Sequence, residues 1–420
     1  MSEVVAVQVG EASFPGPTLA DFEAARVTVD DVVDQTPMES SRYLSEVLGS
    51  DVWLKCENLQ RTGSYKIRGA YNRLVHLSDD EKARGVVAAS AGNHAQGVAF
   101  AARELGIRST IFMPIGVALP KLSATREYGA DVELSGHVVD ETLRAAAQFA
   151  RDTGAVFIHP FDHPDVVAGQ GTLGLEILDQ LPQVDTIIVP IGGGGLISGV
   201  ASAVKQKAAA LGRTIRIVGV QAANAAAYPQ SLINGEPTEL KIGSTIADGI
   251  AVSKPGVLNF EIIRDVVDEV ITVEEDDIAR ALLVLLERAK LVVEPAGAVS
   301  VAAILAGKVQ ASGTTVAILS GGNIDPLVME RIISHGLAAS ERYLKLRIPL
   351  PDRPGQLART AEIIAASNAN VVEVLHTRHG SGMRISDVEL ELHIETRGPE
   401  HAELVMHNLR EAGYHPRVDF

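Results

Sequence analysis

Short runs of apolar residues alternate with helical stretches between about residue 25 and residue 335, and this pattern constrains the fold most strongly. A strand that is apolar at every position is buried on both faces, which is typical of parallel sheets covered by helices on both sides. The sequence therefore predicts an α/β fold with parallel sheets and with helices at stretches such as residues 96–105 and 278–290. Examples of the expected strands are residues 51–55, 85–89, 109–113, 186–190, 216–220 and 315–319.

The pattern changes near residue 341. Residues 343–349 and 385–394 alternate between apolar and polar side chains, as half-buried antiparallel strands do. Helical stretches at residues 357–367 and 399–412 and a last strand within residues 414–420 complete the order strand, helix, strand, strand, helix, strand. This order predicts a separate α+β domain of the ferredoxin-like type.

Three parts of the chain follow from these patterns. Residues 1–22 contain several glycines and prolines and are expected to form a flexible N-terminal arm. Residues 23–335 are expected to form the main domain, and residues 342–420 the C-terminal domain.

The charge balance excludes several classes of partner. The 420 residues include 53 acidic and 37 basic side chains, which gives a formal net charge of −16. An acidic surface repels phosphate backbones and anionic lipids, so neither nucleic acid nor a membrane is an expected partner. No stretch approaches the ~18 consecutive apolar residues of a membrane span, and the N-terminus does not resemble a signal peptide. The single cysteine, Cys56, excludes an intrachain disulfide, and these features together favour a cytoplasmic protein.

Four consecutive glycines follow the strand expected at residues 186–190 and precede a helical stretch. They are Gly192, Gly193, Gly194 and Gly195. Such a run lets successive backbone N–H groups converge on an anion, and the helix N-terminus adds partial positive charge. The pattern indicates either a phosphate-binding turn or a tight turn packed against another element. It lacks the GxxxxGK[ST] of a P-loop and the acidic residue that accompanies a dinucleotide-binding GxGxxG motif.

Lys66 stands in QRTGSYKIRGA (residues 60–70), after a polar turn and at the start of a helical stretch. An isolated lysine is usually a solvated surface charge. Burial and the charge of a helix N-terminus, however, favour the neutral, nucleophilic amine that a Schiff base requires. Lys66 is therefore a candidate catalytic residue.

Two further polar turns follow expected strands. Residues 90–97 (SAGNHAQG) offer backbone N–H groups to a carboxylate, or form an ordinary turn with Asn93 as helix cap. Ser320 follows the strand at residues 315–319, where it faces the ligand crevice of a doubly wound sheet or is satisfied within its own loop. Four such turns at the carboxyl ends of strands together indicate one crevice.

These stretches resemble the threonine dehydratases, also called threonine ammonia-lyases, within the type II pyridoxal-phosphate enzymes. The resemblance covers about residues 25–335. It rests on KCENLQRTGSYKIRGA, ASAGNHAQGVAFAA, HPFDHPDVVAGQGTLGLEI, VPIGGGGLISG, TIADGIAV, VVEPAGA and LSGGNID. It implies a two-lobed catalytic domain, with the smaller lobe inserted at about residues 55–160, and the cofactor pyridoxal 5'-phosphate. The implied reaction converts L-threonine to 2-oxobutanoate and ammonia, with L-serine as a second substrate.

The resemblance also implies a role for each site residue. Lys66 holds the cofactor as a Schiff base, Tyr65 stacks beside its ring, Asn93 contacts its hydroxyl, and Ser320 contacts its pyridine nitrogen. The phosphate is held by Gly192, Gly193, Gly194, Gly195 and Leu196. The substrate is bound by Ser64, Ser90, Ala91, Gly92 and His94. Glu294 is either a carboxylate of the site or the N-terminal charge of a helix, and the sequence leaves both open.

The C-terminal residues 342–420, with the motif PDRPGQLA, resemble an ACT regulatory domain. An amino-acid effector is expected at the loop formed by Asp352, Arg353, Pro354 and Gly355, because it precedes a helix N-terminus. Isoleucine is the first candidate effector, with valine as its antagonist, since biosynthetic members of the family feed isoleucine synthesis. A purely oligomeric role of the domain and a role in threonine catabolism are the alternatives. The resemblance favours a homotetramer.

A serine dehydratase or a serine racemase on the same scaffold is the nearest alternative function, and a catalytically silent amino-acid sensor is the alternative from another class. Ala91 stands where the racemases of the family carry a serine, which favours a dehydratase. Metal-binding members carry carboxylates at the positions of Gln221 and Ala227, so no metal site is expected. His159 and His163 are each followed by a proline, which does not fit a helical zinc pair.

Overall fold

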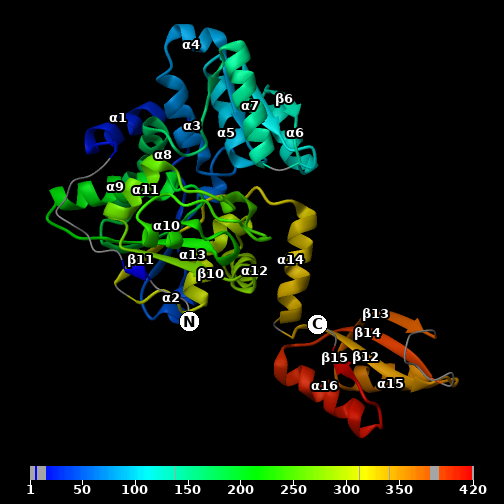
Figure 1. Ribbon diagram of the computed structural model, residues 1–420. Coiled ribbons are helices and arrows are strands. Elements are labelled where there is room, and N and C mark those ends of the chain that lie inside the picture. The colour runs from blue at the N-terminus through cyan, green and yellow to red at the C-terminus, as the bar shows by residue number, and fades with distance from the viewer. Residues whose placement is uncertain are drawn as a thin grey trace. The chain divides into compact units, whose positions relative to one another are not determined.

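The computed structural model of the protein describes residues 5–6, 16–137, 139–311, 313–339, 341–378 and 387–418. The chain forms two compact units, Met1–Pro326 and Leu327–Phe420. The boundary coincides with the start of helix α14 (Pro326–Ala339), drawn in yellow in Figure 1. This helix therefore falls almost entirely in the second unit, although the sequence assigned most of its residues to the main domain.

The larger lobe of the first unit is built on a seven-stranded sheet with the order β1-β10-β9-β8-β11-β3-β2. The strands from β10 to β3 are parallel, whereas β1 and β2 pair antiparallel at the two edges. The strands are β1 (Val5–Ala6), β2 (Met38–Ser40), β3 (Val52–Lys55), β8 (Val184–Pro190), β9 (Arg216–Ala222), β10 (Glu269–Val273) and β11 (Thr314–Ile318).

Helices cover both faces of this sheet, because its central strands are apolar on both sides. Ile187 and Val189 of β8 share a core cluster with residues of α8 and α9, whereas Ile188 points to the opposite face, against which α13 packs. The helices are α1 (Leu19–Val29), α2 (Arg42–Leu48), α8 (Pro164–Gln180), α9 (Gly195–Ala210), α10 (Ala227–Asn234), α11 (Val257–Val266), α12 (Glu275–Val284), its π-helical continuation (Leu285–Ala289) and α13 (Pro295–Leu305). The predicted doubly covered parallel sheet is confirmed.

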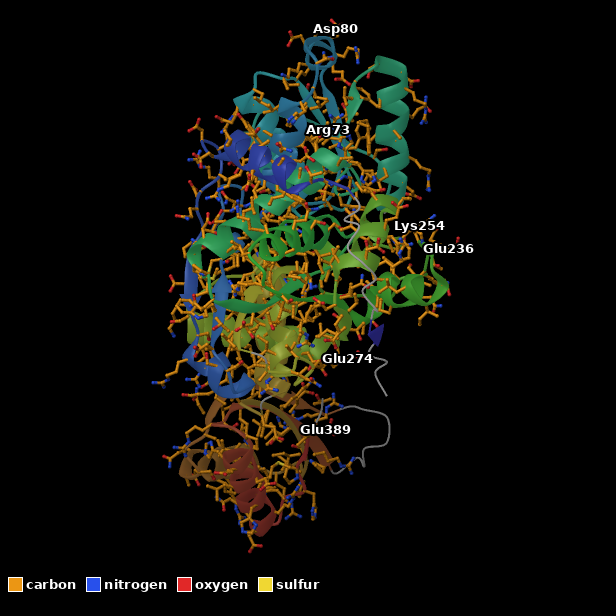
Figure 2. The ribbon with its side chains drawn as sticks, turned by 90° about the vertical axis from the view of Figure 1, so that its left-hand side faces the viewer. Arg73, Asp80, Glu236, Lys254, Glu274 and Glu389 are labelled. Carbon is orange, nitrogen blue, oxygen red and sulfur yellow. The ribbon has the colours of Figure 1, made fainter. Side chains whose placement is uncertain are left out.

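The smaller lobe contains a parallel four-stranded sheet with the order β6-β5-β4-β7. Its strands are β4 (Val86–Ala89), β5 (Ser109–Met113), β6 (Asp131–Leu134) and β7 (Val156–Phe157), and its helices are α3 (Lys66–Val75), α4 (Asp79–Arg84), α5 (Asn93–Glu104), α6 (Leu119–Glu127) and α7 (Val139–Thr153). Ala88 packs with α3 and α5 on one face, and Val87 packs with α7 on the other. Figure 1 shows this lobe in blue and cyan, and Figure 2 labels Arg73 and Asp80 on its helices α3 and α4.

The second unit carries an antiparallel sheet with the order β13-β14-β12-β15 and two helices. Its elements after α14 are β12 (Tyr343–Pro351), α15 (Gln356–Ala366), β13 (Asn370–Thr377), β14 (Asp387–Glu395), α16 (Pro399–Glu411) and β15 (Arg417–Val418). Val388, Leu390, Leu392 and Ile394 all point into one core, as the alternation of β14 predicts. The expected ferredoxin-like order of elements is confirmed.

Two described segments lie within the stretch expected as an N-terminal arm. β1 pairs with β10, and α1 begins at Leu19, where Thr18 and Asp21 form a capping box. Phe22 is fully buried among residues of α8 and α9. Ordered helix therefore starts inside residues 1–22, while residues 1–4 and 7–15 lie outside the described part of the chain.

Candidate active site

Three loops meet at the carboxyl edge of the larger sheet. β8, β11 and β3 are parallel neighbours, so the residues that follow them lie at the same edge. The loop after β3 is joined to the loop after β11, since the N–H of Tyr65 donates to the carbonyl oxygen of Ser320 (3.2 Å) and the N–H of Gly322 donates to that of Gly63 (2.8 Å). The fold therefore brings Lys66, Ser320 and the glycine run to one region.

Lys66 is the first residue of α3, as the sequence predicts, and its Nζ donates to the carbonyl oxygen of Pro160 at 3.0 Å. The same nitrogen lies 5.2 Å from the centre of the Tyr65 ring. Burial lowers the pKa of Lys66 from 10.5 to about 8, and the negative charge of Glu294 opposes this change. The amine therefore loses its proton far more readily than a solvated lysine, and about a tenth of it is neutral and nucleophilic at pH 7.

The glycine run connects β8 to α9, and side chains of other elements pack tightly against it. A Cβ on Gly193 would lie 2.4 Å from the ring of Phe161, and Gly194 has a φ of 102°. The carbonyl oxygen of Gly193 accepts hydrogen bonds from Tyr228 Oη (3.0 Å) and Asn259 Nδ2 (3.2 Å). Packing thus requires glycine here, and the N–H groups of the first turn of α9 have no partner within the helix and can bind an anion.

Asn93 and Glu294 connect the two lobes. Asn93 is the first residue of α5 but does not cap it; its Nδ2 donates to Glu294 Oε1 (2.6 Å), and its Oδ1 accepts from Asn323 Nδ2 (2.9 Å). Glu294 is the residue before α13 and is 4% exposed. Burial, with a contribution from Asp248, raises the pKa of Glu294 from 4.5 to about 7. Glu294 therefore combines both positions that the sequence left open: a helix N-terminus and a carboxylate of the site.

The residues expected to bind substrate surround the same region. Ser64 is fully buried, and its Oγ has no hydrogen-bond partner among the described residues. Ala91 lies in the turn between Ser90, whose Oγ accepts from the N–H of Gly92 (3.1 Å), and α5. His94 is buried, its Nε2 donates to the carbonyl oxygen of Ile158 (2.9 Å), and its backbone N–H lies in the first turn of α5. Burial lowers the pKa of His94 to about 3.

A buried ion network lies behind the first turn of α3. Arg68 donates to Glu57 (2.8 Å) and to Glu176 (2.8 Å), and Glu176 also pairs with Lys55 (2.5 Å). The side chains of Lys55, Glu57 and Arg68 are at most 1% exposed. Because Arg68 is two residues after Lys66, the network fixes the helix that carries the candidate catalytic amine.

Several contacts of the site were not predicted from the sequence. Pro160, Phe161, Tyr228, Asn259 and Asn323 all contact predicted site residues. Pro160 and Phe161 belong to the stretch HPFDHP, whose two histidines instead accept backbone N–H groups: His159 from Asp162 (2.8 Å) and His163 from Asp165 (3.1 Å). The repeated prolines and histidines marked this loop, but nothing in them indicated a contact with the lysine.

Gln221 is fully buried, and its Oε1 accepts the N–H of Tyr228 (2.9 Å). Over the described residues there is no group of three or more His, Cys, Asp or Glu side chains placed to hold a metal ion. Cys56 is buried, and burial raises the pKa of its thiol to about 12. The described helices include none long and apolar enough to cross a membrane.

The expected effector loop lies in the second unit between β12 and α15. Gly355 has a φ of 90° and precedes the helix, and the N–H of Arg353 donates to the carbonyl oxygen of Pro351 (2.8 Å). Asp352 pairs with Arg378 (3.6 Å), and Pro354 completes the turn. The loop thus has the local form expected of it: a glycine in the left-handed region followed by a free helix N-terminus.

Comparison with known proteins gives consistent matches. Residues 29–321 match the model of a family described as pyridoxal-phosphate dependent enzyme. The chain is 48% identical over 402 residues to the L-threonine ammonia-lyase of Thermotoga maritima, covering 96% of this chain and 99% of that protein. Among solved structures, it resembles the processed form of threonine deaminase isoform 2 from Solanum lycopersicum (TM-score 0.71, 36% identity, 79% of this chain and 98% of the other). It resembles a maize serine racemase equally (TM-score 0.71, 36% identity, 78% of this chain and 99% of the other).

Proposed function

The chain belongs to the pyridoxal-phosphate dependent enzymes, and we propose that it is a lyase that converts L-threonine to 2-oxobutanoate and ammonia. The observation that carries this proposal is a lysine of lowered pKa at a helix start, placed at one sheet edge with the glycine run and with Ser320. The 48% identity to a threonine ammonia-lyase over nearly the whole chain supports threonine as the substrate.

The residues present fit pyridoxal 5'-phosphate. The turn at Gly192, Gly193, Gly194, Gly195 and Leu196 suits a phosphate, because it offers backbone N–H groups and the N-terminus of α9 adds partial positive charge. Lys66 suits the cofactor aldehyde, Tyr65 suits the face of the ring, and Asn93 offers Nδ2 to the ring hydroxyl. Ser320 is 3% exposed and suits the pyridine nitrogen.

The bound cofactor supplies an electron sink for the bond-breaking at Cα of the substrate. Because Ser320 is neutral, it does not fix a proton on the pyridine nitrogen as an aspartate would, which favours prompt loss of the β-group over transamination. Lys66 Nζ is the base that accepts the proton from Cα, since its lowered pKa leaves it partly neutral. The hydroxyl of Ser64 and the N–H groups of Ala91 and His94 orient the substrate carboxylate, while the N–H groups of Ser90 and Gly92 hold the shape of the turn by donating to Phe112 O (3.1 Å) and Ser90 Oγ (3.1 Å).

The direct test is a 2-oxoacid assay of the purified protein with L-threonine and with L-serine. We expect 2-oxobutanoate and ammonia in equal amounts from threonine. A serine dehydratase or serine racemase remains the alternative, because the fold resembles a serine racemase as closely as a threonine deaminase. Turnover of serine with none of threonine would favour that alternative and contradict the proposal.

We further propose that the second unit binds an amino-acid effector at residues 352–355 and that it mediates assembly into a homotetramer. Supporting the assembly, β13 is an edge strand, and Val372, Val374 and Leu375 on it are 40–50% exposed. Isoleucine is the first effector to test and valine its antagonist, with a role in isoleucine synthesis as the biological setting and threonine catabolism as the alternative. We propose that the protein acts in the cytoplasm.

This regulatory proposal is tested by titrating isoleucine and valine against threonine turnover in the full chain and in a chain that ends near residue 337. We expect isoleucine and valine to change the threonine turnover of the full chain and not that of the shortened chain. Identical, unresponsive kinetics in both proteins would contradict regulation and leave only a structural role for the second unit.

A further inference from the structure

An ion pair crosses from the smaller lobe to the larger lobe beside the site. Lys121 of α6 donates from Nζ to Oδ2 of Asp248 at 2.8 Å. The side chain of Lys121 is only 16% exposed, whereas that of Asp248 is 59% exposed. The lysine is therefore held inward, with three donors of which the aspartate uses one.

The ammonium group of Lys121 lies against the turn expected to bind the substrate carboxylate. A Cβ built on Gly92 would meet Lys121 Cδ and Nζ at 3.7 Å each. Gly92 precedes α5, so the cation stands next to the N–H groups at the start of that helix. A carboxylate bound by those N–H groups would thus also be within reach of a positive charge.

Asp248 belongs to TIADGIAV (residues 245–252), one of the stretches on which the family resemblance rests. A Cβ on Gly249 would lie 3.7 Å from Glu294 Oε1, and a Cβ on Gly192 would lie 3.1 Å from Cα of Ile250. The turn at Asp248–Ile250 therefore borders both the buried carboxylate of the site and the glycine run. Lys121 and Asp248 meet at the edge of the site, between these two features and the turn at Gly92.

We propose that Lys121 is a further substrate-binding residue, which pairs with the substrate carboxylate beside Gly92, and that Asp248 positions its ammonium group. This inference rests on the proposed function, because it concerns the same amino-acid substrate. An ordinary surface ion pair contributes little to stability and has no reason to bury its lysine. In a chain of net charge −16, a cation at this point also offsets the repulsion that an anionic substrate meets.

The test uses two ligands that lack the β-hydroxyl and therefore cannot eliminate: L-2-aminobutanoate and its carboxamide, L-2-aminobutanamide. Binding to the holoenzyme is followed through the absorbance of the cofactor. We expect Lys121→Met to weaken binding of the carboxylate ligand about 10- to 100-fold, the range of a charge-assisted hydrogen bond. Binding of the amide should change less than about 2-fold, and the KM for threonine should rise more than kcat falls.

Three variants complete the test. Lys205→Met is the matched control, because Lys205 on α9 is 15% exposed and pairs with Asp268 (2.7 Å). This variant should leave the binding of both ligands unaffected. Lys121→Arg should restore most of the carboxylate binding. Asp248→Asn should weaken the carboxylate ligand a few-fold and spare the amide, because the lysine keeps its charge and loses its tether; tighter carboxylate binding would overturn the positioning role of Asp248.

Equal loss for both ligands in Lys121→Met, or no loss for either, would overturn the proposal. Equal cofactor content and equal thermal denaturation of wild type and variants exclude a folding defect as the cause. Failure of the proposed function would be recognised separately, as absence of 2-oxobutanoate from threonine with the wild-type protein.

Discussion

The raised pKa of Glu294 makes a quantitative prediction for the variant Glu294→Gln. Raising the pKa of a carboxyl group from 4.5 to about 7 corresponds, at about 1.4 kcal/mol for each pKa unit, to about 3 kcal/mol. Burial is the main cause, and it disfavours the ionised form. Between pH 4.5 and 7 the folded protein holds a proton on Glu294 that the unfolded chain has lost, so stability falls as the pH rises through this window.

Glutamine removes this cost, and its carbonyl oxygen can still accept the hydrogen bond from Asn93. We therefore expect Glu294→Gln to raise the free energy of unfolding by up to about 3 kcal/mol at pH 8 and to leave it nearly unchanged at pH 4.5. A buried carboxylate that costs stability is typical of a functional site. The measurement is urea unfolding of the cofactor-free protein at several pH values, followed by the fluorescence of Trp53, the single tryptophan.

Glu261→Gln is the control, because Glu261 is an exposed carboxylate on α11 of the same unit. It should show no gain at pH 8. A stability difference between Glu294→Gln and wild type that is independent of pH, or a loss at pH 8, would refute the reasoning about burial.

Further predictions concern the buried ion network, the stereochemistry and the metal. Arg68→Met leaves Glu57 and Glu176 buried with Lys55 as the remaining cation beside them. It should therefore lower the free energy of unfolding in urea titrations by about 3–5 kcal/mol. A loss below about 1 kcal/mol would show that the network does not hold α3. Because Ala91 has no hydroxyl to act as an acid on the second face of Cα, incubation with L-serine should give no appreciable D-serine by chiral chromatography. Treatment with EDTA should leave threonine turnover unchanged, because the side chain of Gln221 is neutral and accepts a hydrogen bond from the backbone N–H of Tyr228. A loss of turnover that a divalent cation restores would contradict this prediction.

The elements that carry the site could be predicted from local sequence. Continuous apolar runs gave the parallel strands within one or two residues, and the polar turn before Lys66 indicated the start of α3. Each candidate turn follows its expected strand because a parallel strand ends where its apolar run ends. These features depend on residues close together in the chain.

The contacts between loops could not be predicted in this way. Asn93 and Glu294 are 201 residues apart and meet only because two lobes close on each other. The support of Gly193 by Tyr228 and Asn259 likewise depends on how α10 and α11 pack beside α9. Periodicity records which face of an element is buried, and it does not record which polar side chain of another element lies opposite.

The central claim is that Lys66 holds the cofactor and acts on threonine. Its most direct test is Lys66→Ala, in which threonine turnover and the borohydride-sensitive absorbance of the bound cofactor are measured on the same preparation. The account predicts that both are lost while the fold is retained. A variant that keeps the reducible absorbance band and near-normal formation of 2-oxobutanoate would contradict it and place the anchoring amine on another lysine.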